Sequence, residues 1–298
     1  MTSTPWTLLV FRVDTTTPDS RTDTLYANGR KQIELIDYDA PTTELADGWS
    51  YSANRNDVFV NTKKYMVSTT RVENKRIGAR VKLPDGTMVT TTTSPYNFYV
   101  TLEGTPPVVY ATDNITVARV TVNKGEKEVD TYIDIETKIG STRMPWSQDN
   151  YYISSNVHDF VKADIYDYDP TGHEQGHEGD MRLANLFNYW WDNGKLRLSF
   201  IWEFATQSTK TVGLYRESRM SGIYTNEIHA SEDIEVNQKS NALCLTRMAF
   251  DIGDDIWGDN WSNSNCGFTI YDHYGNTGQF HASWSEDKDA IVITDSNL

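Results

Sequence analysis

The sequence lacks the motifs that would assign it to an enzyme class. It contains no phosphate-binding loop, no dinucleotide fingerprint and no nucleophile elbow in a strand–helix context. Carboxylate pairs suited to a glycosidase are too numerous for composition to select one, since carboxyl separations decide that chemistry. Those pairs are Asp37/Asp39, Asp134/Glu136 and Asp254/Asp255. The sequence therefore shows no coherent catalytic set.

Cysteine is scarce. The chain has 2 cysteines, Cys244 and Cys266. This number excludes a disulfide-rich scaffold and a zinc site built from several cysteines. Sequence leaves open whether the two residues pair.

The sequence also has few basic residues relative to acidic ones, and it lacks long apolar runs. The chain has 27 Lys and Arg residues and 42 Asp and Glu residues, which gives a formal net charge of −15. Nucleic-acid binding relies on basic side chains, so we expect no nucleic-acid partner. No apolar run has the length of a membrane span, and residues 1–6 lack the pattern of a secretory signal. We expect a cytoplasmic protein, released only by lysis or by a dedicated machine.

What the sequence does contain is a β-strand pattern. Aromatic residues make up 12% of the chain, which is enough for a hydrophobic core. Apolar and polar residues alternate, most clearly in the stretch 196–204, and short turn sequences such as Asn28-Gly29 and Asp85-Gly86 separate such stretches. The pattern predicts an all-β, mainly antiparallel protein.

We expect two β-sandwich-like domains, 1–140 and 151–298, joined by a linker at 140–150 that is rich in small polar residues and contains Pro145. One short amphipathic helix is predicted near 180–192. Its apolar residues recur at helical spacing, with Asp180 as N-cap and Gly194 after the C-terminus. These apolar residues are Leu183, Leu186, Phe187, Trp190 and Trp191.

The stretch 167–178 resembles the calcium-binding loop of EF-hand proteins. Asp167, Asp169 and Thr171 occupy loop positions 1, 3 and 5, Gly172 occupies position 6, and Glu178 occupies position 12. The resemblance implies calcium as a cofactor held by the Asp, Thr and Glu side chains. The alternative is an acidic surface loop rich in turn residues, because no second such loop accompanies it.

The same stretch contains His173-Glu174-x-x-His177, which resembles the zinc-protease motif. The resemblance implies that His173 and His177 bind zinc while Glu174 acts as the base. The motif requires a helix, and the neighbouring glycines and Pro170 disfavour one. A metal-dependent hydrolase is the alternative function that this motif suggests.

A second loop combines acidic and aromatic residues. Acidic groups can bind cations or sugar hydroxyls, and tryptophan faces can stack on sugar C–H surfaces. The loop is therefore a candidate ligand-binding site, with tryptophans anchored in the core as the alternative. Its candidate residues are Asp254, Asp255, Trp257, Asp259 and Trp261.

Together these features favour a non-enzymatic binding or interaction protein. Its β scaffold would present loops to a glycan, a cell surface or a protein partner. A toxin-associated or self-assembling role is compatible with this scaffold, although no residue selects it.

Overall fold

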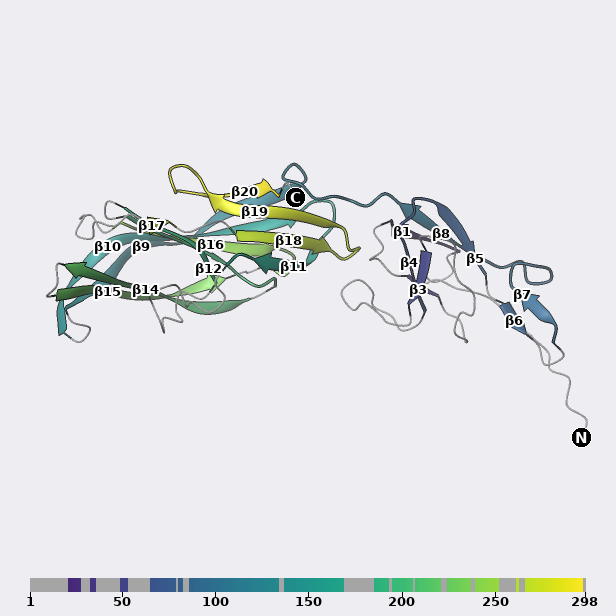
Figure 1. Cartoon of the computed structure of the whole chain (residues 1–298), viewed down its shortest axis with the longest axis horizontal. Helices are drawn as coiled ribbons and strands as arrows, with labels where there is room; N and C mark the ends of the chain where they lie inside the picture. Colours follow the sequence, from purple (N-terminus) through teal and green to yellow (C-terminus); the bar gives the residue numbers. More distant parts are fainter. Residues whose placement is uncertain are drawn as a thin grey trace, which may run out of the picture. The chain divides into compact units, whose positions relative to one another are not determined.

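A computed structural model provides the structure of the protein. It describes residues 21–296 except 28–32, 36–48, 53–64, 79, 83–85, 134–136, 169–184, 193–194, 206, 221–223, 237–238, 252–260 and 263–265. The chain divides into two compact units (Figure 1). Unit 1 comprises Met1–Val109 with Asp272–Thr277, and unit 2 comprises Tyr110–Tyr271 with Gly278–Leu298.

Unit 1 is built from short strands. A three-stranded sheet has the order β1-β8-β5, a second has the order β2-β4-β3, and β6 pairs with β7. The β1–β8 pair is parallel, and the other pairs in this unit are antiparallel. The strands are β1 (Thr22–Tyr26), β2 (Ile33–Leu35), β3 (Trp49–Ser52), β4 (Tyr65–Thr69), β5 (Asn74–Ile77), β6 (Arg80–Lys82), β7 (Met88–Thr90) and β8 (Val100–Thr105).

Unit 2 contains longer strands in two sheets. An eight-stranded sheet has the order β14-β15-β9-β10-β16-β13-β12-β17, and a four-stranded sheet has the order β11-β18-β19-β20 (Figure 1). The strands are β9 (Ile115–Ile133), β10 (Thr137–Ser155), β11 (Phe160–Tyr166), β12 (Leu186–Asp192), β13 (Lys195–Ile201), β14 (Ser208–Met220), β15 (Tyr224–Val236), β16 (Leu243–Asp251), β17 (Trp261–Ser262), β18 (Cys266–Asp272), β19 (Thr277–Trp284) and β20 (Ile291–Asp295).

The middle strands of the eight-stranded sheet are buried on both faces. Along β13, Leu196, Leu198 and Phe200 belong to the main hydrophobic cluster, whereas Arg197 and Ser199 between them face the opposite way and are also buried. Strand side chains alternate between faces, so the second set meets a different neighbour. Ser199 accepts a hydrogen bond from the Trp284 indole, which places the end of β19 against this second face.

The all-β, mainly antiparallel prediction is confirmed, and the described residues contain no helix. Consequently, no described helix is long and apolar enough to cross a membrane. The strands on either side of the turn sequence Asp85-Gly86 pair with one another, since Arg80–Lys82 pairs antiparallel with Met88–Thr90, and Gly86 adopts φ 90°. The sandwich-like arrangement of each predicted domain stays a prediction.

The helix predicted near 180–192 is wrong from Leu186 onward. Leu186–Asp192 forms β12, which pairs with β13 and β17. The ladder to β13 shifts between Leu186 and Asn188, so Phe187 is an extra residue and both Leu186 and Phe187 are buried. This bulge interrupts the period of two at Leu186 and Phe187, which form one of the two adjacent apolar pairs in the spacing that resembles a helix.

The segment 140–150, predicted as a linker, lies inside β10, a central strand of the large sheet. Among the described residues, Pro145 pairs with β9 and pairing with β16 begins at Trp146, so the ladder accommodates the missing backbone donor. Asn123-Lys124-Gly125 contains residues typical of turns, yet it lies inside β9 beside an irregularity in the ladder. Turn-forming residues at these places mark irregular points within long strands.

Both cysteines are buried thiols. Burial raises the pKa of Cys266 to about 12. Since the thiolate is the reactive form, we predict that iodoacetamide does not label Cys266 in the native protein at pH near 8. Both cysteines should react once the chain is denatured, and mass spectrometry distinguishes the two cases. Labelling of native and denatured protein at equal rates would contradict this prediction.

Candidate functional site

The structure describes only the first two residues of the predicted calcium loop 167–178, Asp167 and Tyr168. Asp167 directly follows β11, is exposed and adopts φ 60°, a left-handed conformation that Asp tolerates better than most residues. The strand therefore ends in a sharp bend at this carboxylate. The other predicted metal ligands lie outside the described residues, namely Asp169, Thr171, His173, His177 and Glu178.

Most of the second predicted site also lies outside the described residues: Asp254, Asp255, Trp257 and Asp259. Trp261 is in β17, opposite Trp191 of β12. In the part of the chain that the structure describes, no group of three or more His, Cys, Asp or Glu residues could hold a metal ion. The calcium, zinc and sugar sites all stay predictions.

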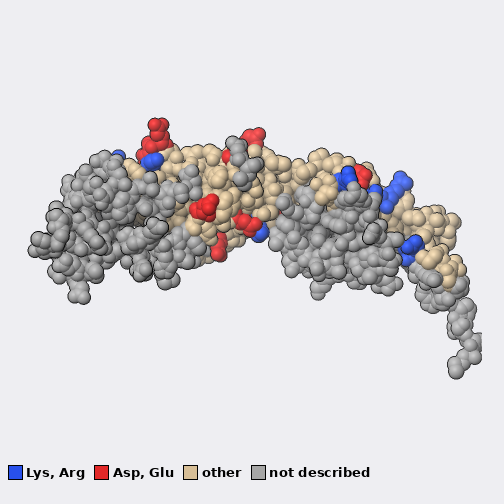
Figure 2. Space-filling model, viewed as in Figure 1, with Lys and Arg blue, Asp and Glu red and all other residues tan. Residues whose placement is uncertain are grey.

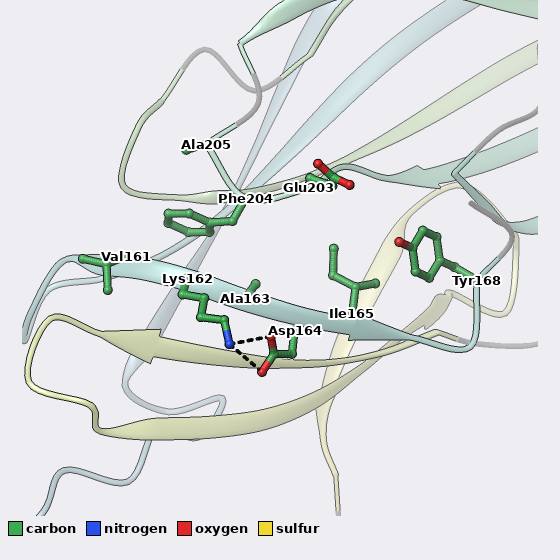
Figure 3. A pocket seen from close by; sticks show the side chains of 9 residues that line it. All are labelled: Val161, Lys162, Ala163, Asp164, Ile165, Tyr168, Glu203, Phe204 and Ala205. Carbon is green, nitrogen blue, oxygen red and sulfur yellow. Dashed lines mark hydrogen bonds and ion pairs between the residues drawn. The ribbon is translucent and has the colours of Figure 1, made fainter. Parts of the chain in front are cut away.

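A cavity of about 480 Å³ lies along β11, beside the bend at Asp167. Its lining includes five consecutive strand residues, Val161 to Ile165, together with Tyr168 and the segment Glu203–Ala205 that follows β13 (Figure 3). Successive strand residues point to opposite faces. A cavity that touches all five therefore follows the edge of the strand, where the backbone is accessible.

The strand order supports this geometry. β11 is the terminal strand of the four-stranded sheet and has β18 as its neighbour. Phe160 at its start contacts Tyr110 edge to face, with ring centroids 5.0 Å apart. Tyr166 at its end covers Gly267 of β18, where any added Cβ atom would collide with the ring. Both ends of β11 are thus fixed by aromatic packing, while its outer edge faces the cavity.

One face of β11 carries an ion pair. The Lys162 ammonium lies 2.7 Å from Asp164 Oδ1 and 4.9 Å from the centre of the Tyr271 ring. Burial of Asp164 acts to raise its pKa, but hydrogen bonds from Lys162 and Tyr271 outweigh this effect and lower it. Asp164 is therefore a carboxylate at neutral pH. Its charge is already balanced by Lys162.

The other side of the cavity carries Glu203, Phe204 and Tyr168. In Figure 3, Phe204 and Glu203 lie on the opposite side of the β11 ribbon from the Lys162–Asp164 pair. Burial and the nearby Glu203 carboxylate raise the pKa of Tyr168, so its hydroxyl stays protonated. Within the described residues, Glu203 forms no ion pair. The cavity thus places the Glu203 carboxylate beside two aromatic rings.

Acidic side chains also lie at several places on the face of unit 2 drawn in Figure 2. Among the lining residues of the cavity, Lys162 contributes one positive charge, and Asp164 and Glu203 contribute two negative charges. Asp167 adds another carboxylate at the bend. The local field favours a cationic group on a bound partner.

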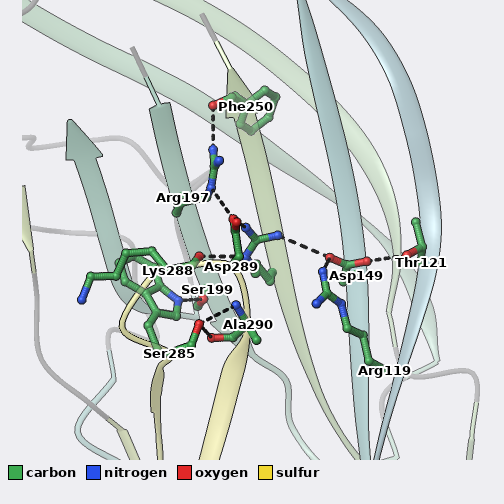
Figure 4. Close-up of polar contacts among 12 residues, drawn as sticks. Arg119, Thr121, Asp149, Arg197, Ser199, Phe250, Ser285, Lys288, Asp289 and Ala290 are labelled. Carbon is green, nitrogen blue, oxygen red and sulfur yellow. Dashed lines mark hydrogen bonds and ion pairs between the residues drawn. The ribbon is translucent and has the colours of Figure 1, made fainter. Parts of the chain in front are cut away.

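A second polar cluster lies between β16 and the turn that joins β19 to β20. Arg247 donates to Asp289 Oδ1 at 2.7 Å and to Asp149 Oδ2 at 3.4 Å. Asp149 also accepts from Arg119 at 2.7 Å (Figure 4). Arg197 bridges Asp289 and Asp251. Arg247, Arg197 and Asp149 are buried. Its geometry suits a structural role.

In comparisons with known proteins, no family model, no curated protein and no solved structure matches the chain.

The cavity residues were missed by sequence reasoning for a specific reason. Glu203-Phe204-Ala205 ends the clearest alternating stretch, and Val161–Ile165 carries no turn or metal motif. The sequence signal nearest to the cavity is Asp167, one residue before Tyr168. An edge groove depends on strand order, which the pattern within one strand does not encode.

Proposed function

We propose that the protein is a non-enzymatic binding protein whose two-layered β scaffold presents the cavity along β11 to a partner. The observation that carries this proposal is the cavity itself, about 480 Å³ along β11. This volume falls within the range of roughly 300–1,000 Å³ typical of ligand sites. The partner is a glycan or a protein segment, which are the classes that polar and aromatic lining residues recognise.

The chemistry of the lining supports binding over catalysis. Lys162 and Asp164 neutralise one another at 2.7 Å, and Tyr168 holds its proton because its pKa is raised by burial and by Glu203. A nucleophile needs an activating neighbour within hydrogen-bond reach. Glu203 and Phe204 instead provide a charge and an apolar surface, which are the components of a recognition site.

The test compares two libraries, a glycan array and a display library of linear peptides, on the parent protein and on Phe204→Ala. We expect binders whose affinity falls by about tenfold in Phe204→Ala, since a buried aromatic contact is worth about 1.4 kcal/mol or more. The matched control is Phe98→Ala, which removes another half-buried phenylalanine, in unit 1.

Binding that survives Phe98→Ala but not Phe204→Ala would support the proposal. If neither library yields a binder, or if both variants bind as the parent does, the cavity is not the binding site and the proposal fails.

A further inference from the structure

The open edge of β11 defines the class of partner more narrowly. We infer that the cavity receives an extended peptide segment with a basic residue, which pairs with β11 as an additional strand. This inference rests on the proposed binding function and specifies the partner of the same site. Its basis is the position of β11 at the end of the β11-β18-β19-β20 sheet.

Backbone pairing is available at this position. In any strand, backbone N–H and C=O groups project alternately to the two sides, so about half of those in β11 point away from β18. Among the described residues, β11 has no strand on that outer side. An unpaired strand edge is a template for another strand, and domains that bind peptides by strand addition use this property.

The extent of the cavity fits a strand. The lining residues Val161 to Ile165 are consecutive. At about 3.3 Å per residue, they span about 13 Å, which is long enough for several ladder hydrogen bonds. A compact ligand would contact alternate side chains on one face. A cavity that follows consecutive residues instead suits a partner that runs alongside the chain.

The side chains around the edge select the sequence of the partner. Phe204 and Ala205 form the apolar part of the far wall, and Glu203 lies beside them. Side chains of an added strand alternate between faces, so an apolar residue can meet Phe204 while its neighbour points the other way. A lysine or arginine within reach of Glu203 would balance its charge, since Lys162 is committed to Asp164.

The first comparison varies the peptide and uses the unchanged parent protein. The probe is a blocked, fluorescent peptide that alternates valine and lysine and is as long as β11, which has 7 residues. Its matched control has the same side chains but N-methylated central residues, which cannot donate backbone hydrogen bonds. A third peptide replaces each lysine with glutamate. Fluorescence anisotropy measures the affinity of each peptide for the parent protein.

We expect the valine–lysine peptide to bind, with affinity about tenfold or more above that of the N-methylated and the glutamate peptides. Glu203→Gln should lower the affinity for the valine–lysine peptide by about twofold to fivefold and reduce the salt dependence of binding. Phe204→Ala should lower the affinity for this peptide by more than Glu203→Gln does, whereas Phe98→Ala should leave the affinity unchanged.

Other outcomes separate the two proposals. Equal affinity of the N-methylated and unmodified peptides would overturn strand addition, because the backbone would contribute nothing. Binding of a glycan at the cavity without binding of any peptide would also overturn it, yet would leave the proposed function standing. If no glycan or peptide probe depends on Phe204, both proposals fail.

Discussion

Arg247→Met is expected to lower the free energy of unfolding by about 3–5 kcal/mol, the usual cost of breaking a buried ion pair. Arg247 is 3% exposed and holds Asp289 at 2.7 Å, the carbonyl of Lys288 at 3.2 Å and Asp149 at 3.4 Å. Burial lowers the pKa of Arg247, as does the nearby positive charge of Arg197, and the two carboxylates oppose this effect. Removing the guanidinium leaves buried Asp149 with less compensation and detaches the β19–β20 turn from β16.

Arg119→Met is the matched control, because it removes a second arginine from the same carboxylate. The Arg119 side chain is 46% exposed and donates to Asp149 at 2.7 Å. That hydrogen bond raises the pKa of Arg119, but solvent screens exposed pairs, so the expected cost is about 1 kcal/mol or less. Urea unfolding followed by tryptophan fluorescence measures both variants. Equal losses in both would show that burial does not determine the contribution of this cluster.

The burial of Arg197 in this cluster could not be predicted from the sequence pattern. The alternation from Leu196 to Phe200 predicted the strand correctly, and β13 forms there. The same alternation placed Arg197 on the polar face, which normally contacts solvent, whereas Arg197 is buried beneath Asp289. The two residues are far apart in the chain. Local pattern therefore predicts that a strand forms but does not identify what covers its polar face.

The incorrect predictions have a related cause. Leu186 and Phe187 have helical spacing because a bulge in β12 buries two successive residues. Pro145 marks the point where β10 gains a second neighbour and does not mark the end of a domain. Both features arise from pairing with distant strands, which determines bulges and edges. The cavity has the same origin, since β11 is an edge only because of the strand order in its sheet.

A second large effect is expected from Asn150→Leu, which should lower the free energy of unfolding by about 2–5 kcal/mol. Asn150 is fully buried in the second half of β10. Its Oδ1 accepts from Thr246 at 2.7 Å and from Gln148 at 3.0 Å, and its Nδ2 donates to the Glu235 carbonyl at 3.0 Å. Leucine has similar volume but leaves these groups short of partners, each at a cost of about 1–3 kcal/mol.

Asn123→Leu provides the matched control for the same substitution. Asn123 is half-buried on β9 and makes a hydrogen bond of 2.7 Å to Gln148 Oε1. This substitution removes one hydrogen bond, whereas Asn150→Leu removes several, so we expect a smaller loss of about 1–2 kcal/mol. Because Asn150 and Gln148 both donate to the Glu235 carbonyl, Asn150→Leu should also increase hydrogen exchange at the end of β15. Unchanged exchange there, together with equal unfolding midpoints for the two variants, would mean that this buried amide cluster does not hold β15 against β10.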